Sequence, residues 1–252
     1  MRSNSDADIY KNREQHLDTR LPESAMFAVR LDGRAFHTFT RHFVKPFDIR
    51  IDKAMVAATK EAFSAMGQCV VAYTQSDEIS LIYAYTADDA KPFSLRIQKI
   101  VSTLASAATA GFVSQLMTFF DLPSYANLPT FDGRVFLLTG TDDAMRYLLW
   151  RRSEAIANAI SAAATAAFGH SRLVGKSDGE RRRMLESAGL DCLIDPRDLY
   201  GAVVAREEWR GDITWRGRDG VERTAPDVVR HRIVAKPAQD KELFLSALLG
   251  TW

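Results

Sequence analysis

Two adjacent carboxylates stand in the tetrapeptide Gln75-Ser76-Asp77-Glu78, between two apolar runs of the sequence. The runs at 70–73 and 79–83 are rich in β-branched and aromatic residues, and the second run alternates. This pattern predicts two strands joined by a tight polar turn, with Asp77 and Glu78 at the tip of a hairpin. Two acids at a solvated hairpin tip are common and need no function. They indicate a functional site only if another carboxylate lies close to them.

A third carboxylate, Asp32, ends a buried strand predicted at about 26–32. Gly33 follows it and lets a ligand or a second backbone come close. If Asp32 and Asp77 converge, their carboxylates and the Gly33 carbonyl form the oxygen-rich site that Mg²⁺ prefers. Two such ions about 4 Å apart can clamp the attacking and leaving oxygens of a phosphoryl transfer. The alternative is that Asp32 caps a turn and Asp77 is a solvated hairpin acid.

The elements that must position these acids follow from the hydrophobic pattern. We expect strands at about 26–32, 69–74, 79–85 and 135–138, and helices at about 49–66, 93–120 and 142–168, the first of them capped by Asp48. The order β-α-β-β-α-β is the split βαβ arrangement, an antiparallel sheet with two helices on one face. Its first and third strands are central neighbours. We therefore predict an α+β fold that brings Asp32 and Asp77 to one sheet edge.

The remaining segments have weaker patterns. We expect a helix or arm at 6–20, a helix near 177–188, a strand at 202–205, a hairpin within 206–236 and a closing helix at 240–252. This divides the chain into a catalytic unit at 1–170 and a C-terminal extension at 171–252 that packs on it as one structural unit.

Composition limits the classes of function. The chain has 252 residues, 46% hydrophobic and 26% charged, with a formal net charge of +1. It contains neither an apolar run of the roughly 20 residues that span a membrane nor a secretory signal. Cys69 and Cys192 lie far apart without metal-binding spacing, which favours a reducing, cytoplasmic setting. The near-neutral charge requires any RNA to meet a local basic surface.

Three basic residues could hold a triphosphate. Arg30 precedes Asp32 by two residues in a strand and so shares its face. Lys45 follows in a loop, and Lys99 sits on a nearly apolar helix, from which a lysine most often extends to water. His37 could equally be an ordinary loop histidine.

Two familiar motifs are absent. The stretch from Gly169 to Gly175-Lys176-Ser177 has five residues between its glycines where a phosphate loop has four, and it follows a helix where that motif follows a strand. No serine occupies the Gly-x-Ser-x-Gly elbow of a hydrolase.

Several motifs together resemble a known family. They are Val29-Arg30-Leu31-Asp32-Gly33-Arg34-Ala35-Phe36-His37, Ala72-Tyr73-Thr74-Gln75-Ser76-Asp77-Glu78-Ile79-Ser80, Phe131-Asp132-Gly133-Arg134-Val135 and Leu148-Leu149-Trp150-Arg151-Arg152. In this order they resemble the tRNA-His guanylyltransferase family and its bacterial and archaeal relatives, over about residues 10–205. The resemblance implies a polymerase-palm-like fold that adds nucleotides in the 3′–5′ direction. An RNA 5′-monophosphate is activated by ATP, and the 3′-hydroxyl of an incoming nucleotide such as GTP attacks it.

The resemblance also implies roles for individual residues. Asp32, Asp77 and the Gly33 carbonyl would hold two Mg²⁺ ions, and Glu78 matches the family's third acid. The nucleotide site would comprise Arg30, Asp32, Gly33, Arg34, Ala35, Phe36, His37, Lys45, Ser76, Asp77 and Lys99. Members of the family are homotetramers arranged as a dimer of dimers. Burial of the apolar helix at 93–120 would fit either a contact between subunits or the core of one chain.

One departure bears on the substrate. The family members that guanylylate tRNA-His carry His-Ile-Asn-Asn-Leu-Tyr-Asn where this chain has residues 156–162, and only Asn158 is retained. This favours templated repair of truncated tRNA 5′ ends over untemplated guanosine addition, although the alanine-rich helix can equally serve packing. Two rival functions use the same fold: a palm-type nucleotide cyclase acting on free nucleoside triphosphates, and a non-catalytic RNA-binding module.

Overall fold

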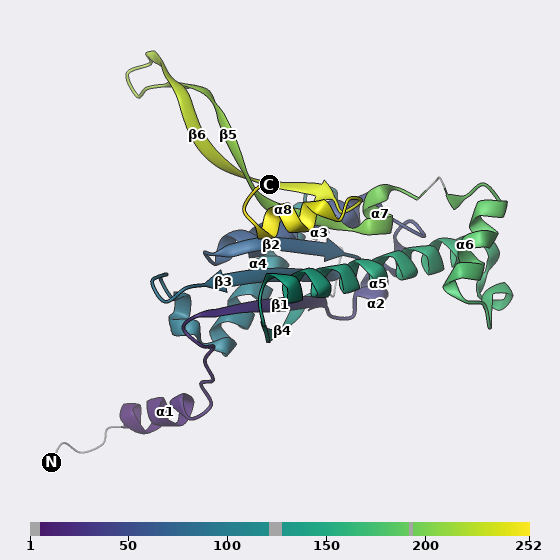
Figure 1. The fold of residues 1–252 in the computed structure, drawn as a ribbon, viewed down its shortest axis with the longest axis horizontal. Coiled ribbons are helices and arrows are strands. Elements are labelled where there is room, and N and C mark those ends of the chain that lie inside the picture. The colour runs from purple at the N-terminus through teal and green to yellow at the C-terminus, as the bar shows by residue number, and fades with distance from the viewer. Residues whose placement is uncertain (1–5, 121–127, 192–193) are drawn as a thin grey trace.

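The computed structural model describes residues 6–120, 128–191 and 194–252, so Cys192 and Pro123 lie outside the described residues. Its centre is a six-stranded antiparallel sheet in the order β4-β1-β3-β2-β5-β6 (Figure 1). The strands are β1 Ala25–Gly33, β2 Cys69–Gln75, β3 Glu78–Tyr85, β4 Phe131–Leu138, β5 Ala202–Arg216 and β6 Glu222–Pro237. The predicted α+β class and the central pairing of the first and third strands are confirmed.

Helices cover both faces of the sheet. The helices of the described residues are α1 Asp6–Gln15, α2 Phe36–Phe39, α3 Ile49–Ala65, α4 Ile97–Leu116, α5 Thr141–Phe168, α6 Asp178–Ser187, α7 Pro196–Tyr200 and α8 Glu242–Leu248. Helix α1 has no buried residue and lies apart from the sheet (Figure 1). Side chains alternate along β1, so Phe27 and Leu31 join the core beneath α3 and α4, whereas Ala28 joins the core beneath α5 and α8. The two helices of the split βαβ unit therefore share one face as predicted, and α5 covers the opposite face.

Helix α3 begins where the sequence predicts. The carboxylate of Asp48 accepts a hydrogen bond from the backbone N–H of Arg50, which satisfies one of the unpaired donors of the first turn. Ser177 caps α6 in the same way and forms a capping box with Glu180. The Gly175-Lys176-Ser177 stretch thus leads into a capped helix and follows the 3₁₀ turn at His170–Leu173, not a strand, in agreement with its rejection as a phosphate loop.

Helix α4 differs from the prediction at both ends. Phe93 and Ser94 have positive φ angles of 55° and 52°, so Pro92 opens only a 3₁₀ turn, Pro92–Leu95. Arg96 is extended and pairs with Arg20 in an isolated β-bridge, and the helix proper starts at Ile97. It ends at Leu116, four residues before the predicted limit.

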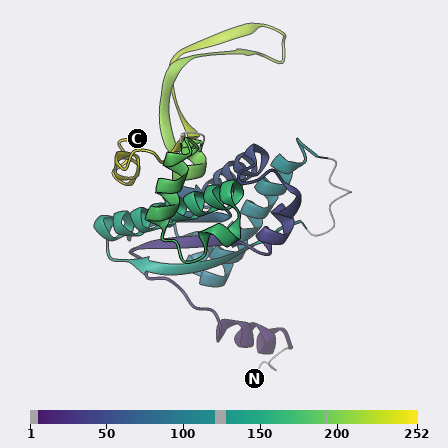
Figure 2. The same cartoon turned by 90° about the vertical axis from the view of Figure 1, so that its right-hand side faces the viewer.

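The C-terminal region extends the sheet. The predicted strand at 202–205 is the paired base of β5, which lies beside β2 and then continues with β6 as a long two-stranded ribbon away from the body (Figures 1 and 2). Helix α8 packs back onto β2 and β5, with Phe244 fully buried against Tyr73. Among the described residues, no helix is both long and apolar enough to cross a membrane.

Candidate active site

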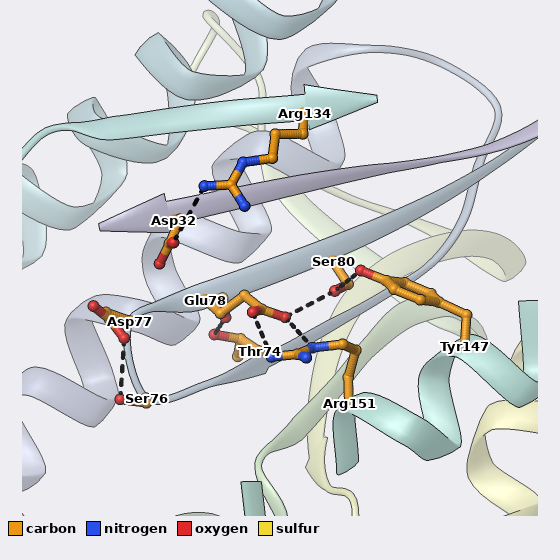
Figure 3. A network of polar contacts seen from close by, with 9 residues as sticks. All are labelled: Asp32, Thr74, Ser76, Asp77, Glu78, Ser80, Arg134, Tyr147 and Arg151. Atoms are coloured by element: carbon orange, nitrogen blue, oxygen red, sulfur yellow. Dashed lines mark hydrogen bonds and ion pairs between the residues drawn. The ribbon is translucent and has the colours of Figure 1, made fainter. Parts of the chain in front are cut away.

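Asp32 and Asp77 meet at one edge of the sheet, as predicted. Strand β1 pairs with β3 so that Asp32 lies opposite Glu78, and the backbone N–H of Gly33 donates to the carbonyl oxygen of Asp77 at 3.0 Å. Burial raises the pKa of Asp77, and the negative charge of Asp32 raises it further. Figure 3 shows Asp32 at the end of β1 beside the turn that carries Asp77, with the carboxylate of Glu78 turned toward Arg151.

The turn that carries Asp77 is a two-residue hairpin loop. Gln75 and Glu78 are its flanking pair, and Ser76 has a positive φ of 48°, as the first central residue of a type II′ turn requires. Gly33 lies against this turn. A Cβ atom at Gly33 would lie 2.5 Å from the Phe36 ring and 3.1 Å from Cβ of Asp77, so glycine permits the close approach of the two segments.

Asp32 and Asp77 are weakly held by the rest of the described chain. Asp32 has a side chain that is 42% exposed, with the guanidinium of Arg134 at 4.0 Å. Asp77 accepts one side-chain hydrogen bond, from the Ser76 hydroxyl at 3.2 Å. Their oxygen atoms are therefore open to a further partner at the sheet edge.

Glu78 lies in a different environment from the other two acids. Nε and Nη2 of Arg151, on α5, donate to its two carboxylate oxygens at 2.7 and 2.6 Å (Figure 3). Burial raises the pKa of Glu78, and the hydrogen bonds and charge of Arg151 oppose that rise. Both oxygens of this acid are occupied by the chain itself.

The acid pair fits a divalent cation. No group of three or more His, Cys, Asp or Glu side chains with metal-binding geometry occurs among the residues that the structure describes. Mg²⁺, however, is commonly held by one or two carboxylates, with water and substrate phosphates completing its shell. Two open carboxylates at one sheet edge, where the charge of Asp32 raises the pKa of Asp77, suit that mode of binding.

A cavity of about 200 Å³ adjoins the Ser76 turn. Its wall is formed by the α2–α3 loop, the end of β2, the middle of α5 and α7, and includes Phe36, Lys45, Ser76 and Asn158. Of the predicted nucleotide-site residues, Phe36, Lys45 and Ser76 thus line one hollow beside Asp77. Its aromatic rings and its lysine are suited to a nucleobase and to an anionic group, respectively.

The other predicted nucleotide-site residues take several positions. Arg30 lies on the same face as Asp32, and its positive charge lowers the pKa of Glu78. Arg34 and Ala35 are exposed on the turn that follows Gly33, where Ala35 has a positive φ of 54°, and His37 is exposed on α2. Buried Phe36 anchors this turn by contacting Phe112 of α4.

Lys99 does not join the cluster within one chain. It is exposed in the first turn of α4, where the N–H of Ile97 donates to the carbonyl of Thr19. Phe112, which contacts Phe36 at the site, follows thirteen residues later on the same helix. Since a helix rises 1.5 Å per residue, Lys99 lies roughly 20 Å from that contact. Within one chain, Lys99 therefore lies at the far end of α4 from this contact, and its place in the nucleotide site stays a prediction.

Sequence reasoning missed two groups that shape the site. Arg151 and Tyr147 stand one turn apart on α5 and hold Glu78 and Ser80, respectively, a spacing that an i, i+4 pattern could have indicated. On the cavity wall, Asp52 pairs with Arg197, and nearby Asp198 has its pKa raised to about 6 by burial and by the charges of Asp52 and Asp195.

Comparisons with known proteins agree with the geometry. The family model described as tRNAHis guanylyltransferase matches residues 8–139. The tRNA(His) guanylyltransferase of Schizosaccharomyces pombe is 35% identical over 145 residues, which cover 57% of this chain and 54% of that protein. The enzyme of Neurospora crassa is 34% identical over 154 residues, 60% and 51% of the two chains. The chain spans about half the length of these curated relatives.

A solved structure shares most of the fold. A bacterial tRNA(His) guanylyltransferase-like protein in complex with ATP has a TM-score of 0.73 and 30% identity, covering 81% of this chain and 87% of that one. The family model accounts for more than half of the residues, including both acid-bearing segments. The chain therefore belongs to the tRNAHis guanylyltransferase family.

Proposed function

We propose that this chain is a Mg²⁺-dependent nucleotidyltransferase that adds nucleotides to the 5′ end of tRNA in the 3′–5′ direction. The observation that carries this proposal is the convergence of Asp32 and Asp77 beside a cavity lined by Phe36, Lys45 and Ser76. The β4-β1-β3-β2 order of the split βαβ unit supports a polymerase-palm-like arrangement.

Each part of the site has a role in this reaction. Asp32 and Asp77, with the Gly33 carbonyl, would hold two Mg²⁺ ions, which when bound neutralise charge on phosphate oxygens and activate the attacking hydroxyl. Lys45 at the cavity mouth would pair with the triphosphate of ATP or GTP. Arg30, on the face of Asp32, would attract the phosphate at the RNA 5′ end. Preorganised charge of this kind supplies most of the rate in phosphoryl transfer.

Of the two reactions of the family, we propose templated repair of truncated tRNA 5′ ends over untemplated guanosine addition to tRNA-His. Residues 156–162 lack the motif of the enzymes that guanylylate tRNA-His, and the structure supports a packing role for the replacements. Ala159 and Ile160 are buried, and Ile160, with the half-buried Ile156, packs in the cluster that includes Leu185 of α6. Asn158, the one retained residue, lines the cavity and is free to contact a nucleotide.

The functional form would be a homotetramer arranged as a dimer of dimers. Helix α4 presents an outward surface of small, uncharged residues that includes Ser102, Ser106, Thr109, Ala110 and Val113. Such a surface supports close helix contact with a second copy. Sedimentation equilibrium of the purified chain tests this assembly.

Nucleotide addition to a 5′-labelled tRNA tests the proposed reaction. Full-length and 5′-truncated transcripts are incubated with Mg²⁺, ATP and each nucleoside triphosphate in turn. We expect the truncated tRNA to be extended only by the complementary nucleotide, and Asp32→Asn and Asp77→Asn to abolish extension. Guanosine addition to full-length tRNA-His alone would support the other reaction of the family. Nucleotide consumption without RNA extension would favour a cyclase. RNA binding without any turnover, with an affinity that Asp32→Asn and Asp77→Asn leave unchanged, would favour a binding module.

A further inference from the structure

A buried ion pair adjoins the acid pair without belonging to it. The side chains of Glu78 and Arg151 are each 10% exposed, and two hydrogen bonds join the guanidinium to the carboxylate. Glu78 follows Asp77 directly in the chain. The pair thus connects α5 to the first residue of β3, one residue from a carboxylate of the proposed metal site.

Neighbouring contacts reinforce this connection. The hydroxyls of Ser80 and Tyr147 lie 2.7 Å apart, so β3 and α5 are joined a second time two residues further along the strand. The ring of Trp150 lies 4.5 Å from the guanidinium carbon of Arg151, a cation–π contact on the solvent side. Helix α5 therefore holds the start of β3 through hydrogen bonds, and its Trp150 ring covers the guanidinium of Arg151.

The turn with Asp77 is consequently fixed from two directions. Gly33 holds it from β1 through the backbone hydrogen bond to the Asp77 carbonyl, and Arg151 holds it from α5 through Glu78. Groups that hydrogen-bond to a metal's own ligands commonly change metal affinity or activity by about 10–100-fold, and Arg151 acts one residue away from the proposed ligand.

We infer that Arg151 is a positioning residue for Asp77, which it orients toward Asp32 by clamping the carboxylate of Glu78. This inference rests on the proposed function, because it assigns the aspartates to a metal site. It also gives Glu78, which matches the family's third acid, a structural role in that site. The planar fork of arginine is essential to the clamp, since lysine carries the same charge but cannot make the paired hydrogen bonds.

Mn²⁺ binding to the full chain, followed by electron paramagnetic resonance, measures the metal site without turnover. We expect Arg151→Lys to weaken Mn²⁺ binding at least tenfold and Asp77→Asn to abolish it, which locates the ion. Glu78→Gln retains an acceptor for Arg151, so its Mn²⁺ affinity should stay within tenfold of the wild type. In nucleotide addition, Arg151→Lys should lower kcat at least tenfold and leave KM for the nucleotide within threefold.

Arg152→Met is the matched control. Arg152 is the next residue on α5, but its guanidinium donates to the carbonyls of Ala238 and Gln239, away from the acids. Its loss should lower the melting temperature without changing Mn²⁺ affinity. If Arg151→Lys fails to fold, the paired substitution of Glu78→Gln and Arg151→Met removes both buried charges together, and it should still bind Mn²⁺ at least tenfold more weakly than the wild type.

The outcomes separate the inference from the function. Unchanged Mn²⁺ affinity and kcat in Arg151→Lys would overturn the inference, as would a loss in Arg152→Met of equal size. Abolished binding in Glu78→Gln would make Glu78 a ligand and also overturn it. A wild type that binds Mn²⁺ but adds no nucleotide would refute the proposed function alone, because the affinity ratios still decide the role of Arg151. A wild type without Mn²⁺ binding would overturn both.

Discussion

The backbone N–H of Gly33 donates a 3.0 Å hydrogen bond to the carbonyl oxygen of Asp77. This bond joins the end of β1 to the β2–β3 turn directly beside the two carboxylates. It forms because β1 and β3 are antiparallel neighbours in the register that sets Asp32 opposite Glu78. Residues more than forty positions apart in the chain thereby become parts of one site, and their mutual repulsion is tolerated at a half-exposed edge.

Replacing Gly33 by alanine should disrupt the site more than the fold. The new Cβ would meet the Phe36 ring at 2.5 Å and Cβ of Asp77 at 3.1 Å, so the turn and the ring must move apart. Overpacking of this kind costs about 1–3 kcal/mol, and a displaced Asp77 should lower nucleotide addition at least tenfold. The test combines urea unfolding with the tRNA extension assay. Gly67→Ala is the control, because its Cβ would meet nothing within 4 Å and activity should persist.

The two lysines singled out by the resemblance should behave differently. Lys45 lines the cavity beside Ser76, so Lys45→Ala should raise KM for the nucleotide about tenfold through the loss of one charge-assisted contact. Lys99 lies at the far end of α4, and Lys99→Ala should leave KM within twofold. Steady-state kinetics of both variants decide the point. An equal rise in KM for Lys99→Ala would mean that this lysine reaches a site outside its own chain.

The sequence was sufficient to predict the relationship between Asp32 and Asp77. The apolar run of β1, the alternating run of β3 and helix caps such as Asp48 define elements whose order predicts the split βαβ topology. Local patterns of this kind determine which strands are neighbours, and the neighbour relation then places the acids. The same patterns predicted that α3 and α4 share a face.

Other features depended on contacts that no local pattern encodes. Phe93 and Ser94 have left-handed backbone conformations, and Arg96 forms a β-bridge with Arg20, so α4 starts only after them. The helix predicted from residue 93 took account of neither feature. The hydrogen bonds from Arg151 to Glu78 require α5 to pack on the sheet face that carries this acid. Helix α5 comes after β4, the last strand of the βαββαβ unit, so the order of that unit does not place it. Sequence order alone therefore could not distinguish a metal-binding Glu78 from a clamped one.

Asp48 should stabilise the protein only when it is ionised. The side-chain hydrogen bond from Arg50, with backbone donors, lowers the pKa of Asp48 to about 2 in the folded state. A lowered carboxylate pKa contributes stability above the unfolded value near 4, and this contribution is lost as the pH falls through about 2. Asp48→Ala should cost about 1–2 kcal/mol of unfolding free energy at pH 7. Urea titrations of both proteins should show the difference shrinking between pH 4 and pH 2, and a constant difference would contradict this origin.

Asp198 should have the opposite effect. Burial, with the negative charges of Asp52 and Asp195, raises its pKa to about 6, so the folded state binds a proton more tightly than the unfolded state. Stability from this group is therefore greatest at low pH and declines as the pH rises from about 4 through about 6. Because the side chain is partly exposed and screened by solvent, Asp198→Asn should gain only about 1 kcal/mol at pH 8. That gain corresponds to a rise in melting temperature of about 2–4 °C for a chain of this size.

Thermal unfolding at pH 8 and pH 4.5 tests the sign of this effect. The advantage of Asp198→Asn should be present at pH 8 and nearly absent at pH 4.5, where the aspartate of the wild type is already protonated. Asp88→Asn, at an exposed aspartate in the turn after β3, should leave the melting temperature unchanged at both values. A variant less stable than the wild type at pH 8 would show that ionised Asp198 makes a favourable contact, most directly with Arg197, whose charge lowers its pKa.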